Sequence, residues 1–411
     1  MKKKKSLKQW LNDLEVKHNK KIDLGLKRIN AVYQNLNLGK IAPVIITVAG
    51  TNGKGSTVAI VSAICQKAGY KVGEFTSPHI LKYNERIKIN NHSVTDELII
   101  AAFELIEKNL KGITLSYFEY ATLAAAIIFK QQKVDVAVLE VGLGGRLDST
   151  NVIDTDCAII TTISIDHTDW LGSTIELIAF EKAGIMRANK PAIYGDSNCP
   201  LSIINHAKEC GAKLLLSDNI KNHQPFKLNI QGKYQQKNAK TAIMALQTLK
   251  AQLTISGDDI KSALQEVKLS GRLEIISTNP AVILDVSHNE QAAQSLSQWL
   301  QDNPIKGKTI AVFAVLTDKK AAQWFDYFSE IIDVWCVSQV ESARAMPVPD
   351  LITQLANTAS LISSFISVET AMNKAQLMAL PEDRIVVFGS FYTVSEALSA
   401  INKTKNNLDD C

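Results

Sequence analysis

The chain has 411 residues, of which 46% are hydrophobic and 21% charged, and a formal net charge of +4. This composition is typical of a globular protein and excludes disordered and fibrous classes, while the length favours two domains. The charge excess is small, which argues against a nucleic-acid-binding protein. No apolar run approaches about 20 residues and no signal peptide is evident, which argues against a membrane or secreted protein. The cysteines are scattered without CxxC pairs, which favours a reducing cytoplasm.

The first elements predicted are helices. Residues 10–38 carry a helical apolar pattern, which residues 21–26 interrupt. Asp23 is a candidate N-cap for the second helix.

Residues 44–57, VIITVAGTNGKGST, follow and predict a buried strand, a glycine-rich turn and a helix. Such a turn presents backbone N–H groups and a helix N-terminus to phosphate, and Lys54 adds a positive charge. The spacing departs from the strict Walker form, because Lys54 is followed by Gly55 and the hydroxyl of Ser56 comes one residue late. We therefore predict a variant P-loop rather than an ordinary turn.

Further strands end in polar residues. Residues 70–75 lead to a turn at Ser77, residues 134–141 contain Glu140 and lead to a glycine-rich loop, and residues 157–163 lead to His167. The carboxyl ends of parallel strands share one sheet edge, so these groups are expected beside the P-loop. Glu140 is a candidate Mg²⁺ ligand, whereas the simpler interpretation of His167 is a core or surface histidine.

Two other groups have ordinary structural interpretations. The aromatic residues before a predicted helix at 121–129 suit the core, and Lys182 suits a helix end, where a cation complements the dipole. Helices are also predicted at 97–110, 238–253 and 258–267.

From residue 282 the chain alternates strands and helices again, with strands at 282–286, 309–313, 334–337 and 385–388 and a weaker one near 366. We predict an α/β protein with a P-loop NTPase-type parallel sheet domain at 1–275 and a smaller Rossmann-like doubly wound domain at 281–411.

These segments resemble those of the dihydrofolate synthase/folylpolyglutamate synthase family, in the Mur ligase superfamily. The resemblance spans residues 22–394. The motifs are AGTNGKGST, TSPHILKYNERI, LSYFEYATL, LEVGLGGRLDSTN, ISIDHTDWLG, FEKAGI, SGRLE, LDVSHN and VFGSFYTV. It implies an ATP-dependent ligase that adds L-glutamate to dihydropteroate and to the γ-carboxylate of reduced folates through an acyl phosphate, with the active site between the domains.

The resemblance also implies roles for individual residues. The catalytic residues would be Lys54, His167 and Lys182, the last of them carbamoylated. The magnesium ligands would be Ser77, Glu140 and His167, and two Mg²⁺ ions are expected. ATP contacts would be Thr51, Asn52, Gly53, Lys54, Gly55, Ser56, Asn238, Arg272 and Asp285. Pterin contacts would be Lys21, Ile22, Asp23, Leu24, Ser116, Tyr117, Phe118, Glu119, Gly145, Arg146 and Leu147.

Departures from the family pattern lie near the glutamate side, such as Ser287 in place of alanine and Glu290 in place of proline. A Mur-type ligase would need a UDP-binding domain of roughly 100 residues before the P-loop, and 43 residues precede Val44. A P-loop switch would need neither a second nucleotide-binding domain nor a modified lysine. A monomer is the default expectation.

Overall fold

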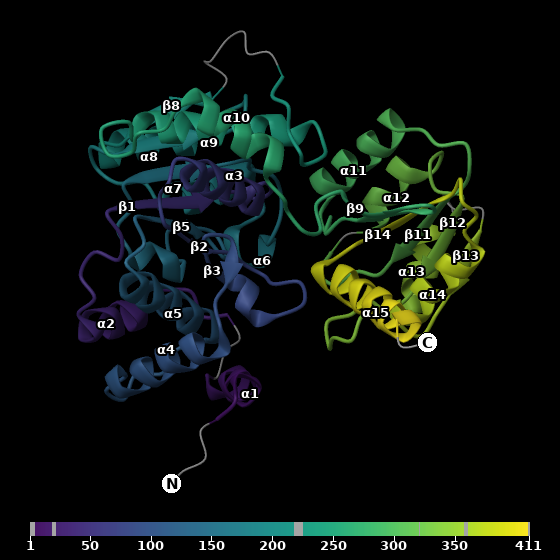
Figure 1. Ribbon diagram of the computed structural model, residues 1–411, viewed down its shortest axis with the longest axis horizontal. Helices are drawn as coiled ribbons and strands as arrows, with labels where there is room; N and C mark the ends of the chain where they lie inside the picture. Colours follow the sequence, from purple (N-terminus) through teal and green to yellow (C-terminus); the bar gives the residue numbers. More distant parts are fainter. Residues whose placement is uncertain (1–4, 19–21, 218–224, 320, 357–360, 410–411) are drawn as a thin grey trace. The chain divides into compact units, whose positions relative to one another are not determined.

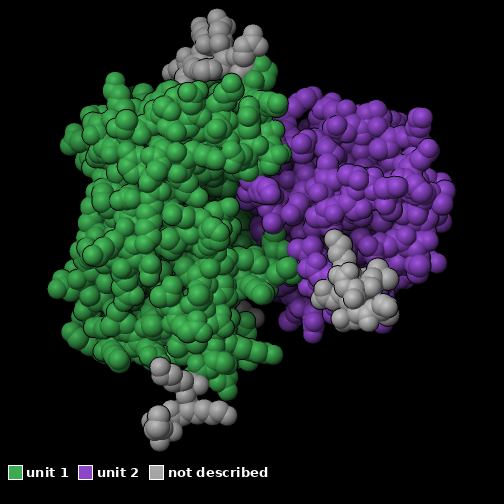
Figure 2. All heavy atoms as spheres, in the orientation of Figure 1, with its two compact units in different colours: residues 1–229, 235–267 green, residues 230–234, 268–411 purple. Residues whose placement is uncertain are grey.

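The computed structural model describes residues 5–18, 22–217, 225–319, 321–356 and 361–409 (Figure 1). The chain divides into two compact units, coloured separately in Figure 2. Unit 1 comprises residues 1–229 and 235–267, and unit 2 comprises residues 230–234 and 268–411. None of the described helices has both the length and the apolar character that a membrane crossing requires.

Unit 1 alternates strands and helices around one sheet. Its elements are α1 (Leu7–Lys17), α2 (Lys27–Leu36), β1 (Val44–Ala49), α3 (Lys54–Lys67), β2 (Val72–Phe75), η1 (Tyr83–Arg86), β3 (Ile87–Ile89), β4 (His92–Ser93), α4 (Asp96–Asn109), α5 (Tyr117–Gln132), β5 (Val136–Glu140), η2 (Ser149–Val152), β6 (Cys157–Ile160), α6 (Thr168–Leu171), α7 (Ile175–Ala183), β7 (Pro191–Tyr194), α8 (Leu201–Cys210), β8 (Lys213–Leu216), α9 (Tyr234–Thr248) and α10 (Gly257–Glu266).

The sheet of unit 1 has the order β4-β3-β2-β5-β1-β6-β7-β8. The strands from β2 to β8 in this order pair in parallel, and β3 and β4 add an antiparallel edge. Every residue of β1, β5 and β6 is buried, as expected for strands covered on both faces. Because β1 lies between β5 and β6, the loops that follow these three strands meet at one edge.

Helices cover the sheet of unit 1 on both sides (Figure 1). A core cluster joins α1, α2, α4 and α5 to the strands through buried residues such as Ile45, Phe103 and Leu139. Helix α3 packs against β1, β2 and β5, and α10 packs against α3. Burial of these apolar side chains is the main favourable term in folding and holds the P-loop strand rigidly.

Unit 2 is a smaller doubly wound domain. Its sheet has the order β13-β12-β11-β14-β10-β9, parallel except for β9. Its aromatic core includes Phe313, Trp335 and Phe388. Its elements are β9 (Glu274–Thr278), β10 (Ala281–Leu284), α11 (Glu290–Asp302), β11 (Thr309–Phe313), α12 (Ala322–Phe325), η4 (Asp326–Phe328), β12 (Val334–Val337), α13 (Val348–Leu355), β13 (Ile362–Ser364), α14 (Val368–Met378), β14 (Arg384–Phe388) and α15 (Phe391–Asp409).

The predicted α/β fold class is confirmed, and some local predictions are wrong. Asp23 is not an N-cap, because α2 begins after Leu26, which has helical dihedral angles. Helix α5 begins at Tyr117 rather than after Tyr120, because Ser116 and Glu119 form a capping box there. The edge strand β9 was not predicted. It lies between the predicted helix at 258–267 and the predicted strand at 282–286.

Candidate active site

The P-loop connects β1 to α3. The N-cap of α3 is Gly53, with a left-handed φ of 84°. A Cβ atom at this position would lie 2.6 Å from Oδ1 of Asn238, so only glycine fits. The Lys54 ammonium bends back and donates to the carbonyl oxygens of Gly50 and Thr51, at 3.1 and 3.2 Å. Strand, turn and helix therefore meet as predicted, with backbone N–H groups at a helix N-terminus.

Residues that follow β6 hold the other side of the P-loop. The backbone N–H of Thr51 donates to the carbonyl of Thr162 at 2.7 Å, and its hydroxyl donates to the carbonyl of Ser164 at 3.1 Å. The Thr161 hydroxyl donates to the carbonyl of Asn52 at 2.6 Å. These bonds fix the loop before any ligand arrives, which lowers the entropy cost of binding.

Glu140 ends β5 beside the P-loop and the turn after β2. Its side chain is 5% exposed, and Oε2 accepts a hydrogen bond from the backbone N–H of Ser77 at 3.2 Å. The same oxygen lies 3.7 Å from the place that a Cβ on Gly55 would take. Ser56, next in the chain, has a hydroxyl that is buried without a hydrogen-bond partner among the described residues. The predicted residues Ser77 and Glu140 are thus in contact, and Glu140 lies beside Gly55, the residue before Ser56.

Hard oxygen donors of this kind suit Mg²⁺, so the residues fit the predicted metal. Within the described part of the chain no three residues of His, Cys, Asp or Glu form a metal-binding group. The metal would therefore depend on serine hydroxyls and on phosphate oxygens in addition to Glu140.

His167 lies at the same sheet edge in a strained conformation. Its φ of 52° is left-handed, which is rare for a residue with a Cβ atom and is typical of functional sites. Its backbone N–H donates to Oδ1 of Asp166 at 2.8 Å. The imidazole is 44% exposed, which rules out the interpretation of His167 as a core residue.

Lys182 is a buried cation from α7 that reaches the P-loop. Its side chain is 4% exposed in all, and Nζ donates to the carbonyl of Gly50 at 3.0 Å. Burial, and next the nearby Lys54, lower the pKa of Lys182 to about 7, against smaller opposite effects of Asp166 and Asp148. A pocket in unit 1 is lined by both lysines, His167, Asp166, the P-loop and residues 141–144. Lys54, at the N-terminus of α3, and Lys182, an amine with a lowered pKa, therefore line one pocket.

The segments predicted to contact a pterin also converge. The backbone N–H of Gly25 donates to the carbonyl of Leu147 at 3.1 Å, which joins the residues 22–26 to the glycine loop. Arg28 pairs with Oδ2 of Asp23 at 2.7 Å and with Oε1 of Glu119 at 3.3 Å. Lys21 lies outside the described residues. The ring centroids of Phe118 and Phe75 lie 5.7 Å apart, and the two rings are tilted relative to each other.

The predicted residues of unit 2 form a group at the end of β10. The buried Asp285 carboxylate accepts hydrogen bonds from the backbone N–H groups of Leu273 and Ser287, each at 2.9 Å, and from the Ser287 hydroxyl. Burial raises the pKa of Asp285, while Ser287 and then Arg272 lower it. The Arg272 guanidinium lies 5.1 Å over the ring of Phe391. Ser287 therefore has a local function that alanine would lack.

Comparisons with known proteins place this geometry in a family. Family models of the Mur ligase middle domain and the Mur ligase glutamate ligase domain match residues 48–272 and 271–391. The dihydrofolate synthase/folylpolyglutamate synthase of Escherichia coli K12 is 39% identical over 97% of this chain and 96% of its own length. The enzyme of the same name from Haemophilus influenzae is 40% identical over 95% of this chain and 96% of its own length. The chain belongs to the dihydrofolate synthase/folylpolyglutamate synthase family.

Solved structures agree. The structure of E. coli FolC in complex with DHPP and ADP superposes with a TM-score of 0.92 at 38% identity, over 98% of this chain and 99% of that one. A bifunctional folylpolyglutamate synthase/dihydrofolate synthase with Mn, AMPPNP and L-glutamate bound has a TM-score of 0.89 at 39% identity, over 97% and 98%. Members of the dihydrofolate synthase/folylpolyglutamate synthase family thus bind a nucleotide, a divalent metal and glutamate in this fold.

Sequence reasoning missed two residues that organise the site of this family member. Asp148 is 2% exposed, and it accepts hydrogen bonds from the N–H of Leu143 at 2.9 Å and from the N–H of Thr150 at 3.0 Å. Burial raises its pKa. Its position before a Ser-Thr pair is an N-cap pattern that could have identified it. Arg28 could not have been found, because its partner Glu119 is 91 residues away.

Proposed function

We propose that this protein joins L-glutamate to dihydropteroate, and to the γ-carboxylate of reduced folates, with ATP as co-substrate. It is an ATP-dependent, amide-forming ligase, and ATP and folate metabolism are common to its relatives. The observation that supports the residue assignment is the convergence of Lys54, Lys182 and His167 with the glycine loop at one pocket.

The chemical problem is that a carboxylate and a triphosphate, both anions, must meet. In the proposed reaction the substrate carboxylate attacks the γ-phosphorus of ATP, and an acyl phosphate and ADP form. The α-amine of glutamate then attacks the acyl carbon, phosphate leaves, and the amine proton is lost to solvent or base. Lys54 and the N-terminus of α3 stabilise the charge that builds up on the transferring phosphoryl group.

The proposed phosphate contacts are the residues of the P-loop turn and the start of α3, and further nucleotide contacts are proposed at Asn238, Arg272 and Asp285. The set is Thr51, Asn52, Gly53, Lys54, Gly55, Ser56, Asn238, Arg272 and Asp285. The fixed hydrogen bonds of Thr51 and Asn52, and the left-handed Gly53, support the first part of this set.

Ser77, Glu140 and His167 would hold magnesium, with Ser56 beside them. When bound, Mg²⁺ would neutralise phosphate charge and orient the phosphoryl group for transfer. Two ions are proposed, as the resemblance to the family implies, with the buried Glu140 and the more exposed imidazole of His167 among their donors.

Lys182 is proposed to be carbamoylated. Its neutral amine would attack carbon dioxide, an N–C bond would form, and one N–H proton of the amine would be released to solvent, which leaves a carbamate anion on the side chain. A pKa of about 7 supports this step, because a large part of the amine is neutral at physiological pH. Carbamoylation would also place an anion at Lys182 beside the cation of Lys54, in place of two neighbouring amines.

The pteridine is proposed to bind the three joined segments near Asp23, the start of α5 and the glycine loop. The residues are Lys21, Ile22, Asp23, Leu24, Ser116, Tyr117, Phe118, Glu119, Gly145, Arg146 and Leu147. Aromatic rings suit a flat heterocycle, and carboxylates accept its N–H donors. We further propose a cytoplasmic monomer whose functional domains are residues 1–275 and 281–411.

The test is an assay with dihydropteroate and tetrahydrofolate side by side, each with glutamate, Mg²⁺ and ATP. The expected result is ADP release that depends on the pteridine acid and on glutamate, with product mass increased by one glutamyl residue. Lys54→Met should abolish it. ATP turnover that ignores both acids would contradict the proposal.

A further inference from the structure

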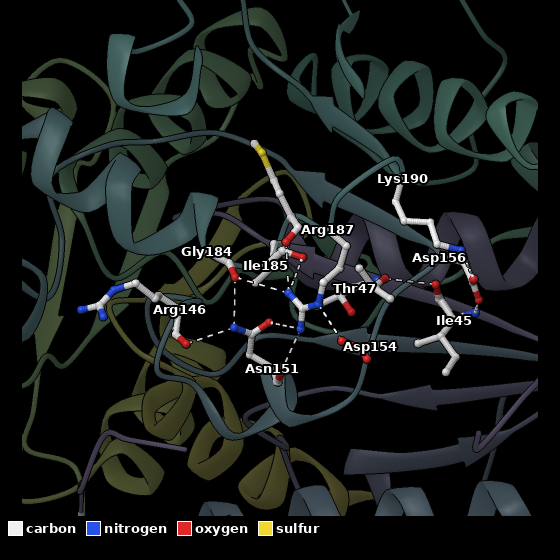
Figure 3. Close-up of polar contacts among 12 residues, drawn as sticks. Ile45, Thr47, Arg146, Asn151, Asp154, Asp156, Gly184, Ile185, Arg187 and Lys190 are labelled. Carbon is white, nitrogen blue, oxygen red and sulfur yellow. Dashed lines mark hydrogen bonds and ion pairs between the residues drawn. The ribbon is translucent and has the colours of Figure 1, made fainter. Parts of the chain in front are cut away.

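The C-terminal end of α7 is held by one arginine. The Nη1 group of Arg187 donates to the carbonyls of Gly184, Ile185 and Met186 at 3.5, 3.2 and 3.1 Å, and Nη2 donates to the carbonyl and to Oδ1 of Asn151, both at 2.9 Å (Figure 3). These three carbonyls belong to the turn that follows α7, in which Gly184 is the C-cap of the helix, and a planar guanidinium can satisfy several carbonyls at once. Arg187 thus closes the end of α7 on to the segment at Asn151.

Asn151 connects this end to the glycine loop. Its Nδ2 donates to the carbonyls of Arg146 and Gly184, both at 3.0 Å (Figure 3). The orientation of this amide is not ambiguous, because the opposite one would place its oxygen against two carbonyl oxygens and its nitrogen against a guanidinium. The amide nitrogen and the amide oxygen of Asn151 therefore both have hydrogen-bond partners.

The loop and the helix end are also in close contact. The backbone N–H of Arg146 donates to the carbonyl of Glu181 at 2.7 Å. A Cβ on Gly184 would lie 2.4 Å from Cβ of Arg146, and one on Gly145 would lie 2.7 Å from the Glu181 carbonyl oxygen. No side chain separates the two segments, so a displacement of one would press directly on the other.

The glycine loop and the end of α7 each carry one group of the proposed site. Lys182, in the last turn of α7 and two residues before Gly184, donates to the carbonyl of Gly50 in the P-loop at 3.0 Å. The Arg146 side chain is oriented by Oε1 of Glu181, at 3.1 Å from Nε and 2.7 Å from Nη2, and lies 5.4 Å over the ring of Phe180. A shift of the α7 end would move both groups relative to the phosphate-binding loop.

We propose that Asn151 and Arg187 are positioning residues of the ligase, which set Arg146 and Lys182 in place against the P-loop. The inference rests on the proposed roles of Arg146 and Lys182 in substrate binding and catalysis. Neither Asn151 nor Arg187 belongs to the predicted site, and neither lines the pocket.

The ion pair of Arg187 offers a control. Nε donates to Oδ1 of Asp154 at 2.7 Å, but the Asp154 side chain is 91% exposed. Exposed ion pairs contribute little to stability. The positioning role therefore belongs to the Nη groups and their carbonyl partners, and loss of Asp154 should leave activity unchanged.

The test compares Asn151→Ala, Arg187→Lys and Asp154→Ala in the full-length protein. We expect the first two to lower kcat and to raise KM for dihydropteroate, each by about tenfold, because small misplacements of reacting groups are costly. KM for ATP should stay within about twofold, because the hydrogen bonds from residues 162 and 164 that hold the P-loop remain. Asp154→Ala should match the wild type in all constants.

A second variant covers the case in which these proteins fold poorly. Guanidinium added at low concentration should restore activity to Arg187→Ala and not to Asn151→Ala, because it can replace the missing guanidinium group but not the missing amide. Unchanged constants in Asn151→Ala and Arg187→Lys, with reduced stability alone, would overturn the proposal. Equal damage from Asp154→Ala would also overturn it. A wild type that uses neither dihydropteroate nor tetrahydrofolate would instead contradict the proposed function.

Discussion

The ammonium groups of Lys54 and Lys182 donate to the same carbonyl oxygen, that of Gly50, at 3.1 and 3.0 Å. Two cations this close repel each other, and burial adds to the cost for Lys182. This arrangement suits a site whose ligands are anions, because a triphosphate, or a carbamate on Lys182, would remove the repulsion.

The first prediction concerns the effect of pH on stability. The pKa of Lys182 is about 7 in the folded protein and near 10.5 in the unfolded chain, so between these values the unfolded chain binds more protons. The cost of burying the lysine is therefore fully present below pH 7 and falls as the pH rises. In buffers free of carbon dioxide, the stability gap between Lys182→Met and wild type should shrink by roughly 1 kcal/mol per pH unit above about pH 7.

Urea unfolding of both proteins at several pH values measures this gap. A gap that is constant from about pH 7 to about pH 9 would show that the ammonium is not destabilised by burial. Restoring bicarbonate should stabilise the wild type only.

The second prediction compares two buried carboxylates on neighbouring strands. Glu140→Gln should lower kcat by about a hundredfold or more, because a neutral amide is a poor ligand for Mg²⁺. Glu74 on β2 is the matched control: burial raises its pKa to about 7, so its carboxyl is already partly neutral. Glu74→Gln should keep kcat within about twofold.

Steady-state rates over a range of Mg²⁺ concentrations check this pair. Equal loss in both variants would mean that a buried charge anywhere in the sheet matters, and would remove the metal role of Glu140.

The third prediction concerns Arg28, which pairs with Asp23 and Glu119. Arg28→Met should raise KM for dihydropteroate by about tenfold and leave KM for ATP unchanged, because two carboxylates lose the group that orients them. Lys27→Met, an exposed neighbour with the same charge change, is the control. If both variants behave alike, the effect is one of net charge and the pterin assignment of Asp23 loses its support.

The fourth prediction separates capping from substrate contact at Ser116, whose side chain accepts from the N–H of Glu119. Ser116→Ala should lower the free energy of unfolding by about 1 kcal/mol. Ser116→Thr keeps the capping hydroxyl and should retain most of the stability, but its added methyl group would occupy the proposed substrate contact and should raise KM for dihydropteroate by about tenfold. An unchanged KM in Ser116→Thr would leave Ser116 with a capping role alone.

The local structure of the P-loop and of the sheet edge beside it could be predicted from patterns in the sequence. A β-branched run, a glycine turn and a helical pattern identify the P-loop within 14 residues, and apolar strands that end in Glu140 or precede His167 identify the sheet edge. These predictions worked because propensity, turn chemistry and strand burial act over short stretches of chain. The family motifs then supplied the ligase function.

Other features were decided only by tertiary structure. The sequence could not tell that Asp23 would pair with Arg28 rather than cap a helix, nor that Lys182 would be buried against Gly50, 132 residues away. The hydrogen bonds between Arg187 and Asn151 likewise join residues 36 positions apart. Such contacts depend on which strands become neighbours and on how much water is excluded, and both are properties of the packed chain rather than of any short segment.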